Sequence, residues 1–156
     1  MHRSSLIFLP ALLFPFSLLA APDTVKVEVL QNKLEHPWSQ AFLPDNKGLL
    51  VTLKGGQLKH WQAGKGLSDP ITGVPKVWDN GQGGLLDVVL APDFATSRRV
   101  WLSYAEAGAD GKAGTAVGYG RLSDDLSRLE AFQVVFRHMN QLQNQVLYIL
   151  LIQSFH

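Results

Sequence analysis

The chain has 156 residues, of which 46% are hydrophobic and 17% charged, a composition ordinary for a folded soluble protein of one domain or part of one. The formal net charge is +1, and no basic run suggests nucleic acid or a membrane surface as a partner. The absence of cysteine excludes disulfides, thiolate metal sites and lipid attachment through an N-terminal cysteine. We therefore expect a small, uncharged partner.

Residues 1–20 have the pattern of a secretory signal peptide. Arg3 is followed by an apolar run from Leu6 to Leu19 and then by the small residues Ala20 and Ala21. The run contains two prolines and is shorter than the roughly 20 residues of a membrane-spanning helix, which favours cleavage over anchoring. The sequence thus predicts an exported protein, and the periplasm of a Gram-negative bacterium suits it.

Apolar runs of strand length, separated by Gly and Pro, follow the signal peptide. Val25–Leu30 alternates apolar and charged residues, as does a strand with one buried face. Four further strands, with a tight turn at Gly55-Gly56, are expected at Trp38–Leu43, Leu49–Leu53, Gln57–Trp61 and Val74–Trp78. These four predict an antiparallel meander.

The same order recurs in the second half. Strands are expected at Leu85–Leu90, Val100–Tyr104, Ala116–Leu122 and Phe132–Phe136. The Pro-Asp pair at 44–45 recurs at 92–93, which is 48 positions later. A period near 50 residues with four strands per unit is the spacing of a β-propeller blade, although a sandwich or barrel fits the spacing as well. Propellers typically have four to eight blades, so two units predict an incomplete ring.

The loop between the two meanders is the strongest candidate for a binding site. It reads W-D-N-G-Q-G-G from Trp78 to Gly84 and leads directly into the apolar run Leu85–Leu90. Glycine and asparagine tolerate positive φ and let the backbone approach a ligand closely, while Gln82 supplies one amide side chain. A polar, glycine-rich loop at the end of a buried strand is a common place for function.

The last part of the chain differs in composition. Beyond Arg137 there is no Lys, Arg, Asp, Glu, Gly or Pro, and Val146–Ile152 is entirely apolar apart from its tyrosine. Residues 138–156 are therefore either a strand or helix that packs on the domain, or a tail produced by a shifted reading frame. Both interpretations remain open.

Four motifs carry a family resemblance. They are P-W-S-Q-A-F-L-P-D at 37–45, D-P-I-T-G-V-P at 69–75, G-Q-G-G-L-L-D-V-V-L-A-P-D-F at 81–94 and G-K-A-G-T-A-V-G-Y-G-R-L at 111–122. In this order they closely resemble the soluble periplasmic aldose sugar dehydrogenases that depend on pyrroloquinoline quinone (PQQ), of the glucose/sorbosone dehydrogenase family. The resemblance covers about residues 25–137, and it identifies 21–137 as the N-terminal part of such a propeller.

The resemblance implies an all-β fold of which this chain holds the first two four-stranded blades of six. It also implies PQQ and a calcium ion near the propeller axis, an aldose substrate, and oxidation at the anomeric carbon with hydride transfer to the quinone. Gln82 is the one family site residue that the chain carries, beside the quinone and the substrate. Asp87 lies in the same motif and is interpreted either as a ligand contact or as a structural acceptor.

One motif of the family is missing. An Asn-His pair, whose histidine is the general base, is expected soon after Phe136-Arg137, but the chain continues as His138-Met139-Asn140. The resemblance therefore assigns no catalytic residue and no metal ligand to this chain. Two functions are kept: part of a quinone dehydrogenase that is inactive by itself, or a small exported all-β binding protein without catalytic activity.

Other motifs in the sequence give little indication of a functional site. The histidines show no metal-ligand spacing, and His36 before Pro37 is interpreted as a turn residue. Gly118-Tyr119-Gly120 lacks the strand-to-helix context of a dinucleotide site. Trp78 is expected to pack within the fold, with stacking on a sugar as the lesser alternative.

The first prediction concerns export. If residues 1–20 are a signal peptide, N-terminal sequencing of the periplasmic protein will begin near Ala21 or Pro22, because the small residues there suit the peptidase. Recovery of the uncut chain from the membrane fraction would contradict it.

Overall fold

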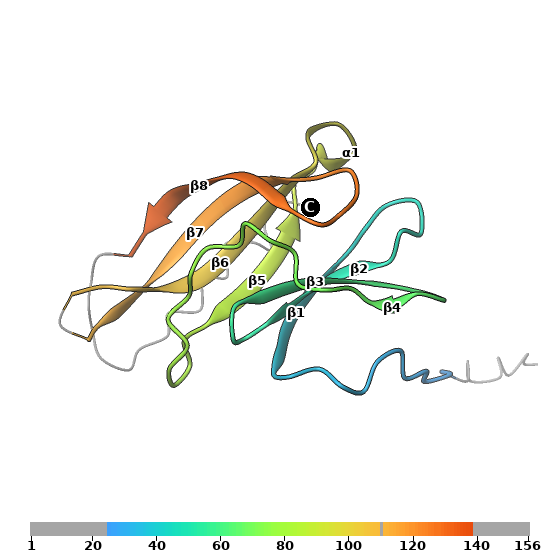
Figure 1. Cartoon of the computed structure of the whole chain (residues 1–156), viewed down its shortest axis with the longest axis horizontal. Coiled ribbons are helices and arrows are strands. Elements are labelled where there is room, and N and C mark those ends of the chain that lie inside the picture. The colour runs from blue at the N-terminus through green and yellow to red at the C-terminus, as the bar shows by residue number, and fades with distance from the viewer. Residues whose placement is uncertain (1–24, 110, 139–156) are drawn as a thin grey trace, which may run out of the picture.

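The computed structural model describes residues 25–109 and 111–138, which form two antiparallel four-stranded sheets (Figure 1). The first sheet contains β1 (Pro37–Phe42), β2 (Leu49–Leu53), β3 (Gln57–Gln62) and β4 (Gly66–Leu67), and the second contains β5 (Leu85–Leu90), β6 (Arg99–Ala107), β7 (Ala113–Leu122) and β8 (Leu129–Arg137). Each sheet is a meander in chain order, so the predicted all-β fold is confirmed. A four-residue helix, α1 (Phe94–Ser97), joins β5 to β6.

Several predicted features fall outside the described residues. The signal peptide, residues 1–20, and all of the tail except His138 are among them. Within the described part, no helix has the length and apolar character needed to cross a membrane.

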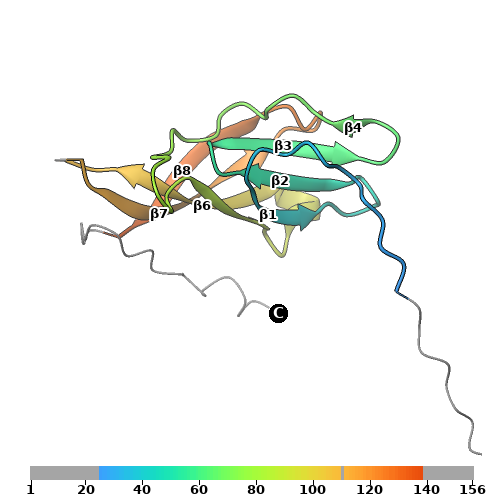
Figure 2. The same cartoon turned by 90° about the horizontal axis from the view of Figure 1, so that it is seen from below.

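The two sheets lie against each other (Figure 2). The hydrophobic core lies between them. Its buried residues come from both sheets and from the connecting segments: Leu43, Leu50, Leu58, Ile71, Leu85, Val88, Phe94, Val100, Leu102, Tyr104, Ala116, Leu122 and Leu129. All five residues of β2 are buried, because Leu49, Val51 and Leu53 pack on the other face against Leu34, Trp61 and Leu67. A strand covered on both faces has a continuous apolar sequence instead of an alternating one.

Two predicted strands are wrong. Val25–Leu30 is not a strand, and Val25, Val27 and Val29 are 75–87% exposed, because no neighbouring strand in the described part of the chain pairs with this segment. The fourth strand of the first sheet is Gly66–Leu67 and not Val74–Trp78, since the chain turns back at once and pairs Leu67 with Trp61. Val74 and Val77 instead pack against the core from a segment without strand structure.

The other strands agree with the predictions to within a few residues. β6, β7 and β8 extend further than expected because alanine, glycine and polar residues outside the apolar runs continue their ladders. Gly118 and Gly120 lie inside β7, which confirms that they do not form a dinucleotide loop. A Cβ atom at Gly118 would come within 2.7 Å of the Phe132 ring, so glycine permits close packing there.

The Thr52 hydroxyl joins the two sheets at their centre. Thr52 is fully buried on β2, and its Oγ1 donates to the Leu86 carbonyl of β5 at 2.6 Å. The same oxygen accepts the Ser39 N–H of β1 at 3.0 Å. One hydroxyl of β2 therefore satisfies polar groups of two other strands, β1 and β5, in a place where unpaired groups would be costly.

A second junction involves the turn between β7 and β8. The Thr72 N–H donates to the Ser127 carbonyl at 3.0 Å, and the Leu129 N–H donates to the Thr72 carbonyl at 2.8 Å. Hydrogen bonds from the Ser123 hydroxyl, and then from the N–H and hydroxyl of Ser127, lower the pKa of Asp125 to about 2. The ionised carboxylate thus orders the turn that pairs with Thr72.

The second prediction tests the Thr52 junction. Thr52→Val keeps the side-chain shape but leaves the Leu86 carbonyl and the Ser39 N–H without their partner, so we expect a loss of about 1–3 kcal/mol in the free energy of unfolding. Urea denaturation measures it. In the control, Thr72→Val, the hydroxyl removed is exposed and 3.4 Å from its acceptor, and the change should stay within about 0.5 kcal/mol. Equal losses in the two variants would contradict the assigned role of Thr52.

Candidate functional site

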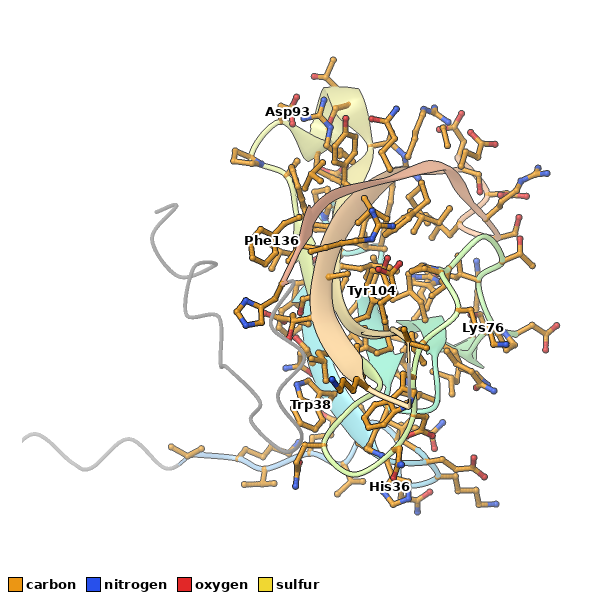
Figure 3. All side chains as sticks on the ribbon, turned by 90° about the vertical axis from the view of Figure 1, so that its left-hand side faces the viewer. His36, Trp38, Lys76, Asp93, Tyr104 and Phe136 are labelled. Carbon is orange, nitrogen blue, oxygen red and sulfur yellow. The ribbon has the colours of Figure 1, made fainter. Side chains whose placement is uncertain are left out.

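The candidate site lies at the edge of the molecule where β1 and β5 begin and β2 ends. The Lys54 carbonyl, just after β2, accepts the N–H of Leu85, the first residue of β5, at 2.9 Å. The backbone carbonyl of His36, just before β1, accepts the Lys54 N–H at 3.0 Å. Figure 3 shows His36 and Trp38 toward this edge and Asp93 at the opposite end. The loop of residues 78–84 therefore lies beside the turn that joins β2 to β3.

Both ends of the loop are held by the backbone of β6. The Trp78 N–H donates to the Ala105 carbonyl at 2.8 Å, and the Ala105 N–H donates to the Gly84 carbonyl at 2.8 Å. Between them, the Gly83 N–H donates to the Asn80 carbonyl at 2.8 Å and closes a turn. The middle of the loop is thus presented from a fixed base.

Two glycines allow the loop to pack closely on its surroundings. A Cβ atom at Gly84, where φ is +139°, would come within 2.3 Å of the Lys54 carbonyl oxygen. One at Gly83 would come within 2.6 Å of the Trp78 ring. Trp78 therefore packs beneath the loop, as the sequence predicted.

The tip of the loop, by contrast, faces open space. Gly81 has a φ of +56°, and a Cβ atom built there would meet nothing within 4 Å. Gln82, the predicted site residue, follows it and is exposed. An amide can donate and accept hydrogen bonds simultaneously, so an exposed Gln82 can orient a polar ligand.

Asp87 is accounted for by contacts within the protein. Its Oδ1 accepts the Ser39 hydroxyl of β1 and the Val88 N–H at 2.9 Å, while the Asp87 N–H donates to the Ser103 hydroxyl at 3.1 Å. Of the two interpretations, these contacts support the structural acceptor. Asp87 connects the first strands of the two sheets beside Thr52.

The remaining titratable groups of the described part are not arranged as a metal site or a base. Residues 25–109 and 111–138 contain no cluster of three His, Asp or Glu that could hold a metal ion. His60 Nε2 lies 2.5 Å from the Lys47 carbonyl, away from the loop. Burial, and then the charge of Glu106, raise the pKa of Tyr104, so its phenol keeps its proton at neutral pH.

An ion pair that the sequence did not predict lies at the base of the loop. Lys54 Nζ is 2.6 Å from Asp79 Oδ1, with 23% of the lysine side chain and 45% of the aspartate side chain exposed. The two residues are 25 positions apart, and neither belongs to the motif around Gln82 that carried the resemblance. Only the fold brings them together.

The two sheets and their glycine loop define part of a propeller of the kind found in quinone-dependent sugar dehydrogenases. The profile of the family described as Glucose / Sorbosone dehydrogenase matches residues 34–148, which is more than half of the chain, so the chain belongs to that family. The predicted resemblance is thereby confirmed.

Individual proteins similar to this chain are also sugar dehydrogenases. The chain is 68% identical over 142 residues to an aldose sugar dehydrogenase of Escherichia coli K12, covering 91% of this chain but 38% of that protein. The crystal structure of the soluble aldose sugar dehydrogenase from Escherichia coli in the apo form matches with a TM-score of 0.74 and 74% identity, covering 76% of this chain and 34% of the other. The PQQ-bound aldose sugar dehydrogenase from Streptomyces coelicolor matches with a TM-score of 0.63 and 26% identity, covering 72% and 33%.

The chain therefore spans 33–38% of the length of these relatives. Because they are dehydrogenases, the alternative of a binding protein without chemistry is not favoured.

The third prediction compares two glycines of the loop. Gly84→Ala should lower the free energy of unfolding by at least about 1–3 kcal/mol from backbone strain, with a further cost from the contact with the Lys54 carbonyl. Gly81→Ala faces open space and should cost only about 1–2 kcal/mol from its left-handed backbone. Urea denaturation measures both, and a Gly81→Ala loss as large as that of Gly84→Ala would refute the packing described for the loop.

Proposed function

We propose that the chain forms part of a PQQ-dependent dehydrogenase that oxidises aldoses at the anomeric carbon, and that its contribution to the quinone site is the Gln82 loop. The observation that carries this proposal is the exposed Gln82 amide on a glycine loop held at both ends, in a chain 68% identical to an aldose sugar dehydrogenase. PQQ enters the proposal through the PQQ-bound relative from Streptomyces coelicolor.

The residues of the loop are suited to one contact with PQQ or with the sugar. The open space beside Gly81 leaves room for a flat ligand, and the Gln82 amide can donate to a quinone oxygen or accept from a sugar hydroxyl. Bound PQQ would supply the two-electron acceptor that takes the hydride. Gln82 itself can orient and hydrogen-bond, but an uncharged amide cannot remove a proton at neutral pH.

We further propose that this chain does not oxidise sugars by itself. Removal of a general base typically costs about 10²–10⁴-fold in rate even when the other groups are present. The place where the family resemblance puts the Asn-His pair is occupied by His138-Met139, and the His138 N–H donates to the Thr115 carbonyl at 2.7 Å as part of the β7–β8 ladder. Proton removal from the sugar would therefore depend on residues that this chain does not supply.

Three further elements are proposals of the same kind. The calcium ion follows from the family resemblance, and the residues that would hold it are not assigned to this chain. An aldose substrate is supported by the aldose sugar dehydrogenases among the relatives. Periplasmic localisation follows from the predicted signal peptide in residues 1–20.

The fourth prediction tests quinone binding. Titration of the mature chain with PQQ, followed by tryptophan fluorescence, should give saturable quenching, and Gln82→Ala should weaken the affinity by about 2- to 10-fold, as expected for loss of one uncharged hydrogen bond. Gln133→Ala is the matched control, because Gln133 is an exposed glutamine on β8 whose partner is the Tyr119 hydroxyl. Equal affinities of wild type and Gln82→Ala would contradict the role of Gln82.

The same preparation tests the absence of turnover. With PQQ, calcium and glucose, dye reduction by the mature chain should stay at the level of the protein-free control, while the full-length Escherichia coli aldose sugar dehydrogenase serves as the positive control. Turnover by the short chain would show that a base exists where none is assigned.

A further inference from the structure

We propose that Lys54 and Asp79, here called the loop clamp, are positioning residues that hold the Gln82 loop in its binding geometry. The expected effect of the loop clamp on ligand affinity rests on the proposed function. The clamp itself is a property of the protein alone, and it can be measured without a ligand.

Lys54 connects three parts of the site through three different groups. Its N–H donates to the His36 carbonyl before β1, and its carbonyl accepts the Leu85 N–H at the start of β5. Its ammonium group binds the Asp79 carboxylate in the loop. The side-chain contact is the one that reaches the first half of the loop, because the two backbone contacts hold the starts of strands.

The aliphatic part of Lys54 lies against the other end of the loop. A Cβ atom at Gly84 would come within 2.7 Å of Lys54 Cγ as well as 2.3 Å of its carbonyl oxygen. The Lys54 side chain therefore extends along Gly84, and its ammonium group reaches Asp79. Only 23% of this side chain is exposed. A lysine whose stem is already packed loses less rotamer freedom on forming an ion pair.

The turn that follows Lys54 packs on the same segment. A Cβ atom at Gly56, where φ is +98°, would come within 3.0 Å of Val77 Cγ2, and one at Gly55 would lie 3.7 Å from Asp79 Oδ2. Asp79 is thus seated between the β2–β3 turn and the Lys54 ammonium. Gln82 follows three residues later, within the turn closed by the Gly83 N–H and the Asn80 carbonyl.

The two ends of the loop are held by different kinds of contact. Gly84 and Leu85 are held by backbone hydrogen bonds to β6 and Lys54, which substitution of a side chain leaves in place. The first half, from Trp78 to Asn80, has one backbone bond to Ala105 and the ion pair. Loss of the ion pair should therefore loosen the loop before Gln82 and leave the sheets intact. A loosened loop must be ordered again when a ligand binds, which lowers affinity without removing any ligand contact.

The fifth prediction measures the clamp directly by hydrogen exchange of the mature chain without ligand. Asp79→Asn and Lys54→Met should each raise the exchange rates of the Trp78 and Gly83 amides by about two- to fivefold, the range of partly exposed ion pairs. Lys54→Arg, which keeps the charge, should retain most of the protection. The Leu122 amide, which donates to the Arg98 carbonyl at a distant edge, should not change.

The matched control is another partly exposed ion pair. Arg121 Nη1 lies 3.3 Å from Glu130 Oε2, with side-chain exposures of 47% and 40%, and joins β7 to β8. Glu130→Gln should leave the exchange of Trp78 and Gly83 unchanged. Unchanged loop exchange in both clamp variants, or a uniform increase that includes Leu122, would overturn the clamp.

A PQQ titration of the same variants separates this inference from the proposed function. If the clamp positions Gln82 for a quinone, Asp79→Asn should weaken quenching affinity by the same two- to fivefold factor as it speeds loop exchange. If the wild type does not bind PQQ while loop exchange changes as expected, the clamp stands and the proposed function fails. Unaltered affinity in a variant with faster loop exchange would show that the clamp does not position a quinone contact.

Discussion

The Thr52 hydroxyl is the buried polar contact around which the two sheets meet. This fully buried group lies where three strands meet, donates to the carbonyl of Leu86 and accepts the N–H of Ser39. Two residues further along, the Lys54 carbonyl accepts the N–H of Leu85. The bonds to Leu86 and Leu85 join one sheet to the other, whereas the bond from Ser39 joins β1 to β2 within the first sheet. The Ser39 hydroxyl also crosses between the sheets, because it donates to Asp87 of β5. Apolar packing stabilises the pair of sheets but permits sliding, whereas buried directional bonds fix one register.

This register determines where the candidate site lies. Because β5 begins against the end of β2, the preceding loop must pass over Lys54 and Gly55, and Gly84 is required where the loop touches Lys54. The backbone of Ala105 holds both ends of the loop, and Lys54 reaches Asp79 near its start. Gln82 is exposed in the middle of this loop, whose ends are held by Ala105 and Lys54. An amide on a fixed loop binds with less loss of entropy than one on a mobile loop.

Local patterns predicted most of the fold. Seven of the eight strands in the described residues follow from apolar runs bounded by Gly and Pro, and β5 was placed to the residue. The failures have tertiary causes: Val25–Leu30 has the alternation of a strand but no partner in the described part of the chain, and Val74–Trp78 packs on the core without joining a sheet. Gln82 was found through its glycine motif and a family resemblance. The Lys54–Asp79 pair could not be found, because its residues are 25 positions apart and the sheet pairing alone brings them together.

The most direct test of this account is a crystal structure of the mature chain grown with pyrroloquinoline quinone. The account predicts the two sheets joined at Thr52 as described, with quinone density beside Gly81 and the Gln82 amide about 2.7–3.2 Å from a quinone oxygen. An ordered loop with the quinone bound elsewhere on the chain, or sheets packed in a different register, would contradict it.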